Sequence, residues 1–164
     1  DARISIVLSD NPDAFILERA RKRGIGTALI DCRGFKTKFP EEAQQETAAK
    51  LKAAGVELVC LAGFLRLVKR PLLDAFPNRI LNIHPALLPA FPGLESWKQA
   101  LDAGVSETGC TVHYVDEGMD TGPVILQEKV PVLPGDTAET LHARIQVAEH
   151  RAYPAAIAVA GQSL

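Results

Sequence analysis

The sequence lacks the features that several classes of protein require. Its three cysteines are an odd number and none lies in a CxxC pair, so neither a disulfide framework nor a zinc site is expected. No apolar run approaches about 18 residues and no signal-peptide pattern opens the chain, so we expect no membrane association. A reducing, cytoplasmic location is the interpretation that fits.

The chain also lacks an excess of charge of one sign. Lys and Arg total 18 and Asp and Glu total 20, a formal net charge of -2, which argues against nucleic acid as a main partner. No GxSxG, HExxH or GxxxxGK[ST] pattern occurs, so no serine nucleophile, zinc-protease site or phosphate loop is indicated. With 164 residues, 47% of them hydrophobic, residues 1–164 are predicted to form a single domain.

What is present is an alternation of short apolar runs and helical patterns. The pattern predicts an α/β fold: a doubly wound, mostly parallel sheet, with antiparallel strands added toward the C-terminus. The apolar run 56–62 predicts a strand that is buried on both faces. Cys60, in this run, and Cys110, in a later apolar run, are both expected to lie in the core. We expect strands at 4–8, 27–30, 56–62, 79–83, 111–115 and 124–130, and helices at 11–24, 40–55, 71–76, 95–103 and from 136 onward.

Two helix starts are suggested by capping residues. Asn11 and Pro12 would open the first helix. Asp136 would cap the last one, with Glu139 three residues later in a capping box. That last helix is expected to bury Leu141, Ile145 and Ala148.

Asn82 and His84 lie where an apolar strand runs into a proline-rich turn. Ligands of open α/β sheets bind beyond the carboxyl ends of the strands, and a spacing of two puts both side chains on one side of the chain. His84 can move a proton near neutral pH, and the Asn82 amide can donate to an oxygen that gains negative charge. The pair fits attack on a carbonyl group. That both residues only satisfy backbone groups is an equal alternative.

Asp120 supplies a third candidate, in the loop that precedes a strand at 124. A carboxylate near His84 would orient the imidazole ring and stabilise its charged form. Taken alone, an Asp so close to Gly122 is more often a turn residue.

Three segments together resemble the formyltransferases that use 10-formyltetrahydrofolate. They are residues 82–89 (NIHPALLP), 109–115 (GCTVHYV) and 119–125 (MDTGPVI). Residues 62–67 (AGFLRL) and 146–150 (QVAEH) resemble the members that act on glycinamide ribonucleotide in purine synthesis. The resemblance covers about residues 4–159.

The resemblance implies direct transfer of a formyl group, with no metal and no covalent intermediate. Asn82 would hold the oxyanion, His84 would be the general acid/base, and Asp120 would assist His84. His113 would support them, with a packed strand histidine as an equal alternative. Partners would be glycinamide ribonucleotide and 10-formyltetrahydrofolate, and a homodimer is one arrangement that stays open.

The resemblance also implies where the two substrates bind. A pterin ring needs an apolar slot with backbone hydrogen bonds, and a glutamate tail needs a cation such as Arg66. The implied folate residues are Leu65, Arg66, Leu67, Val68, Asn82, Tyr114, Val115, Asp116, Glu117, Gly118, Met119 and Asp120. The implied ribonucleotide residues are Gly63, Pro85, Gln146 and Glu149.

The sequence departs from the family at its start. The family opens with one more strand and a glycine-rich turn that cradles a phosphate, and neither is found here, so we expect a piece of a longer protein. Three alternatives stay open: a related enzyme such as a deformylase or a tRNA formyltransferase, a non-catalytic folate- or nucleotide-binding domain, and a plain nucleotide-binding fold.

Overall fold

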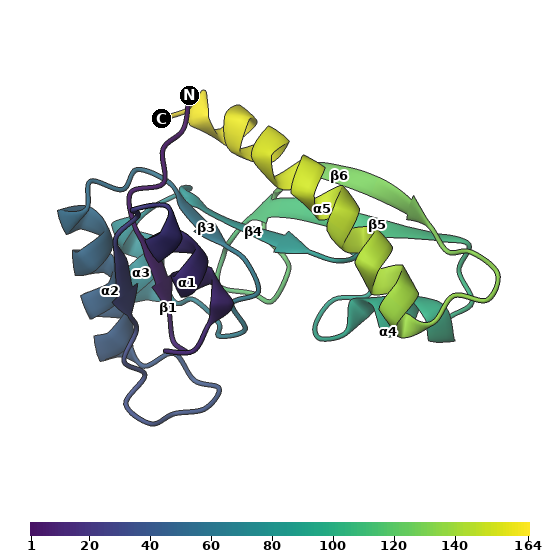
Figure 1. Ribbon diagram of the computed structural model, residues 1–164, viewed down its shortest axis with the longest axis horizontal. Helices are drawn as coiled ribbons and strands as arrows, with labels where there is room; N and C mark the ends of the chain where they lie inside the picture. Colours follow the sequence, from purple (N-terminus) through teal and green to yellow (C-terminus); the bar gives the residue numbers. More distant parts are fainter.

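Strands and helices alternate along the chain in the computed structural model, which describes residues 1–164 (Figure 1). The strands are β1 (Val7–Ser9), β2 (Thr27–Leu29), β3 (Val59–Leu61), β4 (Ile80–His84), β5 (Glu107–Tyr114) and β6 (Val124–Pro131). The helices are α1 (Phe15–Lys22), α2 (Glu41–Ala53), α3 (Arg70–Ala75), α4 (Ser96–Asp102) and α5 (Ala138–Gly161). None of the helices has the combination of length and apolar character that a membrane span requires.

The strands form two sheets. β1 and β2 pair in parallel, and a second sheet has the order β3-β4-β5-β6. In that sheet β3 and β4 are parallel, whereas β5 and β6 are each antiparallel to their neighbours. The predicted α/β class, with parallel strands first and antiparallel strands added later, is therefore confirmed, although the parallel strands fall into two separate pairs.

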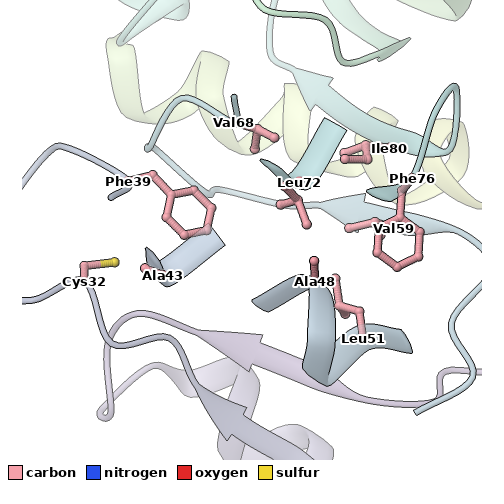
Figure 2. Packing of buried hydrophobic residues seen from close by; sticks show 10 residues of the cluster. All are labelled: Cys32, Phe39, Ala43, Ala48, Leu51, Val59, Val68, Leu72, Phe76 and Ile80. Atoms are coloured by element: carbon pink, nitrogen blue, oxygen red, sulfur yellow. The ribbon is translucent and has the colours of Figure 1, made fainter. Parts of the chain in front are cut away.

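The chain has two apolar cores, and the larger sheet contributes strand residues to both. Figure 2 shows the first core, where Leu72 of α3 and Val59 of β3 lie beside Ala48 and Leu51 of α2. The second core lies between α5 and the larger sheet, with the α5 residues Leu141, Ile145 and Ala148 buried as predicted. Strand β4 joins the cores, because Ile80 belongs to the first and Leu81 to the second.

The strand predicted at 56–62 is shorter and less buried than expected. Val56 instead belongs to the turn that closes helix α2: its N–H donates to the Leu51 carbonyl, and Gly55 before it has a φ of 72°. The prediction that Cys60 is a core residue is wrong, because β3 pairs with β4 on one edge only and Cys60 is exposed. Cys110 is buried, as expected.

Both predicted helix starts are displaced. Asn11 closes a turn by accepting from the N–H of Asp13 through its side chain, and α1 begins only at Phe15. Helix α5 is capped by Thr137, whose hydroxyl accepts from the Thr140 N–H while the Thr140 hydroxyl accepts from the Thr137 N–H. Asp136 instead forms an ion pair with Arg144, in the second turn of the helix.

Candidate functional site

Strand β4 presents Asn82 and His84 on the face of the sheet that α5 does not cover. Side chains alternate along a strand: Leu81, just before Asn82, is fully buried in the core under α5, and Ile83, between Asn82 and His84, packs against the same core. In the antiparallel pair with β5, Asn82 lies opposite His113 and His84 lies opposite Thr111. Directly opposed residues share a face, so two histidines, one amide and one hydroxyl converge there.

Asp120 reaches this group from the loop between β5 and β6. Its Oδ2 lies 3.5 Å from His84 Nδ1 and its Oδ1 lies 3.9 Å from His113 Nε2. The Gly93 N–H donates to the same Oδ2 at 2.9 Å, which fixes the carboxylate. The structure therefore brings together Asn82, His84, His113 and Asp120, four residues that lie in three separate segments of the sequence.

The hydrogen bonds of His84 assign its two ring nitrogens. Nε2 lies 2.8 Å from the Phe91 carbonyl oxygen, which can only accept, so Nε2 carries a proton. In the neutral ring the lone pair is then on Nδ1, which faces Asp120. A proton taken up at Nδ1 would lie between the imidazole ring and the Asp120 carboxylate.

Two polar groups of the site have no partner within the chain. The Asn82 side chain makes no hydrogen bond, and the Nε2 atom of His113 is buried without one. Since buried polar groups are nearly always paired, unpaired groups beside a histidine–carboxylate pair are available to a ligand. His84 itself is only 5% exposed, so its ring is shielded from bulk water.

Sequence reasoning missed the residues that hold the loop after β4. The buried Thr111 hydroxyl donates to the Ala86 carbonyl and accepts from the Leu88 N–H, and Gln127 Nε2 donates to both the Leu88 carbonyl and Thr111 Oγ1. This network fixes the segment that carries the Phe91 carbonyl to His84. A threonine inside an apolar strand was the available signal.

Backbone geometry aims the loop that carries Asp120. The β5–β6 pairing shifts register at Val112 and His113, a bulge that turns the start of β6. Asp120 itself has a φ of 55°, a left-handed conformation that a short polar side chain tolerates. At Gly122 a Cβ atom would lie 1.7 Å from the Tyr114 carbonyl oxygen, so only glycine fits this close approach.

Asp116 organises the same loop from within. Its Oδ1 accepts from the Thr121 hydroxyl and from the Gly118 N–H. The hydrogen bond from Thr121 is the main cause that lowers the pKa of Asp116 below its ordinary value. Glu117 forms an ion pair with Arg70 at the start of α3, so the loop is tied to the other side of the site.

Several residues predicted to contact folate point elsewhere. Val68 is 2% exposed in the first core, and Tyr114 packs with the second core, on the face opposite His113. Arg66, predicted as the cation for a glutamate tail, has its guanidinium bound to Asp10 and two backbone carbonyls within the chain. Leu65 and Met119 are exposed, at 78% and 54%, as contact residues for a ligand would be.

The residues predicted for the ribonucleotide come from three places: Gly63 follows β3, Pro85 follows β4, and Gln146 and Glu149 lie on α5. Gln146 is exposed and Glu149 is partly buried on α5, and burial raises the pKa of Glu149 above its ordinary value. The Pro85 carbonyl accepts from Ser96, and Gly63 has a φ of 65°. No hydrogen bond or ion pair joins these residues to Asn82, His84 or Asp120.

Comparison with known proteins identifies a family and close relatives. The model of the family described as "Formyl transferase" matches residues 1–157. Phosphoribosylglycinamide formyltransferase of Bacillus subtilis is 43% identical over 96% of this chain and 80% of its own length. The trifunctional purine biosynthetic protein adenosine-3 of Drosophila pseudoobscura pseudoobscura is 50% identical, but the chain spans only 11% of its length.

Solved structures agree with the sequence relatives. Glycinamide ribonucleotide transformylase 1 from Symbiobacterium toebii superposes with a TM-score of 0.90 at 55% identity, covering 94% of this chain and 72% of that one. Phosphoribosylglycinamide formyltransferase from Bacillus halodurans gives 0.88 at 45% identity, over 94% and 79%.

Proposed function

Because the chain belongs to the formyl transferase family, we propose that its site transfers a formyl group from 10-formyltetrahydrofolate to the amine of glycinamide ribonucleotide. The observation that carries the proposal is the meeting of Asn82, His84 and Asp120 at the end of β4, with the Asn82 amide unpartnered and His84 Nδ1 facing the carboxylate. The relatives named for this reaction support the choice of acceptor.

The reaction proceeds by direct attack. The amine nitrogen of the ribonucleotide forms a bond with the formyl carbon, and the carbonyl oxygen becomes an oxyanion that accepts a hydrogen bond from the Asn82 amide. His84 takes the proton released by the amine and donates a proton to N10 of the folate. The bond between N10 and the formyl carbon then breaks, releasing tetrahydrofolate and the formylated amide. Asp120 stabilises the imidazolium between these steps.

The two substrates approach from different sides of the site. The folate would use the exposed side chains of Leu65, Leu67 and Met119 together with backbone groups of the Asp120 loop, since the side chains of Val68 and Tyr114 are committed to the cores. The ribonucleotide would lie toward Gly63, Pro85 and α5, where Gln146 can donate to oxygen and Glu149 can accept from hydroxyl or amine groups. The reaction would take place in the cytoplasm, and a homodimer stays a prediction.

Substitution of the two β4 residues tests the proposal. His84→Ala and Asn82→Ala should each lower kcat by about a hundredfold or more, because each removes a group that acts mainly in the transition state. The assay follows folate absorbance with 10-formyltetrahydrofolate and glycinamide ribonucleotide. Lys22→Ala, on an exposed turn of α1 with a side chain 69% exposed, is the control and should keep the parent rate. Near-parent rates in either β4 variant would refute the assigned roles.

Omitting one substrate separates the alternatives. Turnover that requires the ribonucleotide supports the transferase, and turnover without any amine acceptor indicates a deformylase. Folate binding without turnover indicates a non-catalytic domain, and turnover with aminoacylated tRNA alone indicates the tRNA-directed relative.

A further inference from the structure

Arg66 occupies an unusual place between the strand ends. Its Nε donates to Asp10 Oδ2 at 2.6 Å, and its Nη1 donates to the carbonyls of Phe35 at 2.8 Å and Lys38 at 2.5 Å. Asp10 follows β1, Phe35 and Lys38 follow β2, and Arg66 follows β3. One guanidinium therefore ties together the segments at the carboxyl ends of three parallel strands.

Lys50 of α2 donates to the Leu29 carbonyl of β2, but the Arg66 tie is the one polar connection from the first sheet and its loops to residues beyond α2. No other hydrogen bond or ion pair joins residues 1–38 to residues 54–164, and β1 and β2 share no strand pairing with β3. The Arg66 side chain is only 11% exposed and Asp10 28%, so solvent screens the pair less than it screens a surface ion pair. An arginine held by three acceptors loses little freedom on further ordering, which suits a fixed anchor.

The residues on either side of Arg66 face outward. Leu65 is 78% exposed and Leu67 is 41% exposed, while the Arg66 side chain between them turns inward. The anchor thus holds the middle of the segment that offers two apolar side chains to the proposed folate slot. The guanidinium itself does not point into that slot.

We propose that Arg66, through its ion pair with Asp10, is a positioning residue for the formyl donor: it fixes the segment 64–68 that contacts folate and leaves ribonucleotide binding untouched. The inference rests on the proposed function for the identity of the donor. It differs from direct recognition of a glutamate tail. If Arg66 bound the tail, loss of the competing Asp10 carboxylate would strengthen folate binding, whereas if Arg66 only positions the segment, loss of Asp10 should weaken it.

Asp10→Asn and Arg66→Met test this difference. We expect each to raise the KM for 10-formyltetrahydrofolate about tenfold, with the KM for glycinamide ribonucleotide and kcat within about twofold of the parent. The double variant should be no worse than either single variant, because both remove the same interaction. Arg66→Lys keeps the charge but cannot reach three acceptors at once, and should fall between parent and Arg66→Met.

Arg33→Gln is the matched control. Like Arg66, Arg33 has three partners, in this case the acidic side chains of Asp31, Glu42 and Glu46, but none of these partners lies beyond α2. Its loss should leave the donor KM unchanged. If Asp10→Asn leaves the donor KM unchanged or lowers it, or if both KM values rise together, the inference is wrong.

Direct binding keeps the inference testable apart from catalysis. Calorimetry with a non-reactive folate analogue should show the same tenfold loss in Arg66→Met, and hydrogen exchange should be faster in residues 31–38 and 61–69. If the parent binds the analogue but shows no turnover, the proposed reaction fails while these comparisons still decide on Arg66. If the parent does not bind the analogue, both fail. Should Arg66→Met not fold, Asp10→Asn and Arg66→Lys carry the test.

Discussion

At the scale of single residues, the carboxylates of the site serve different ends. Asp120 lies between two histidines and accepts a hydrogen bond from a backbone N–H. Asp116 accepts hydrogen bonds from Gly118 and Thr121 of its own loop. Glu149 is partly buried and its carboxylate makes no hydrogen bond, and burial alone raises its pKa above the ordinary value. A carboxylate kept in this state costs stability, which argues that it is retained for a ligand.

Glu149→Gln should therefore stabilise the free protein and impair ribonucleotide binding. A carboxyl group whose pKa is raised by folding adds stability that is complete below its unfolded pKa and is lost as the pH rises through its folded pKa. The amide does not titrate, so the variant should gain on the parent as the pH rises above the ordinary glutamate pKa, and show little gain near pH 4. Urea midpoints at pH 4, 6 and 8 measure this.

Ribonucleotide affinity is the second measurement on the same variant. Its KM for glycinamide ribonucleotide should rise about tenfold, since an amide accepts more weakly than a carboxylate. The exposed Glu18→Gln, on α1, is the control and should alter neither quantity. A Glu149→Gln variant that is less stable than the parent at pH 8 would contradict the desolvation argument.

At the scale of elements, the segment from Pro85 to Gly93 matters as much as the strand that precedes it. It supplies the Phe91 carbonyl to His84 and the Gly93 N–H to Asp120. Its own position depends on Thr111 of β5 and Gln127 of β6. The two antiparallel strands would thus influence the proposed reaction through a loop to which they do not belong.

Thr111→Val should damage activity more than its size suggests. The substitution preserves volume but leaves the Leu88 N–H and the Ala86 carbonyl without a side-chain partner, at a cost of about 1–3 kcal/mol. We expect kcat to fall about tenfold as the loop shifts away from His84. Steady-state kinetics and a urea titration measure the two effects.

Thr108→Val provides a matched control on the same strand. Thr108 is 1% exposed and its hydroxyl has no hydrogen-bond partner. Replacing it removes an unsatisfied group, so stability should hold or rise and kcat should not change. Equal losses in both threonine variants would show that burial alone, rather than the loop network, accounts for the effect.

Element by element, the sequence predicted what local patterning controls. Alternation in β4 placed Asn82 and His84 on one face, and the 3.6-residue period placed Leu141, Ile145 and Ala148 under α5. It failed where a distant partner decides. Cys60 is exposed because β3 lacks a second neighbour, and Arg66 turns inward because Asp10, 56 residues away, attracts it. The site contact made by Asp120 depends on a bulge and a positive φ that no periodicity reveals.

At the scale of the whole molecule, two apolar cores share one strand. Ile80 and Leu81 are neighbours in β4, and each is buried in a different core. Tyr153 of α5 adds a polar link, since its hydroxyl donates to the Leu61 carbonyl of β3 at 2.6 Å. Because β4 contributes residues to both cores, loss of one core should disorder the strand that the other core needs. The two cores are therefore expected to unfold together, as a single domain would.

Leu72→Ala tests this coupling from the first core. Leu72 is 2% exposed on α3, and its truncation should lower the free energy of unfolding by about 2–5 kcal/mol. Trp97, the single tryptophan, packs against the second core, so its fluorescence reports on that core alone. We expect the tryptophan transition to shift by as much as the transition seen by far-ultraviolet circular dichroism.

Leu141→Ala completes the test from the second core. Leu141 is fully buried under the larger sheet, and its truncation should shift both probes equally as well. A tryptophan transition that stays in place in Leu72→Ala, while the dichroism curve splits in two, would show instead that the β1–β2 side unfolds by itself. In that case strand β4 and the Arg66 tie would be too weak to couple the β1–β2 side to the rest of the chain. Substitutions at Asp10 should then leave the KM for the formyl donor unchanged.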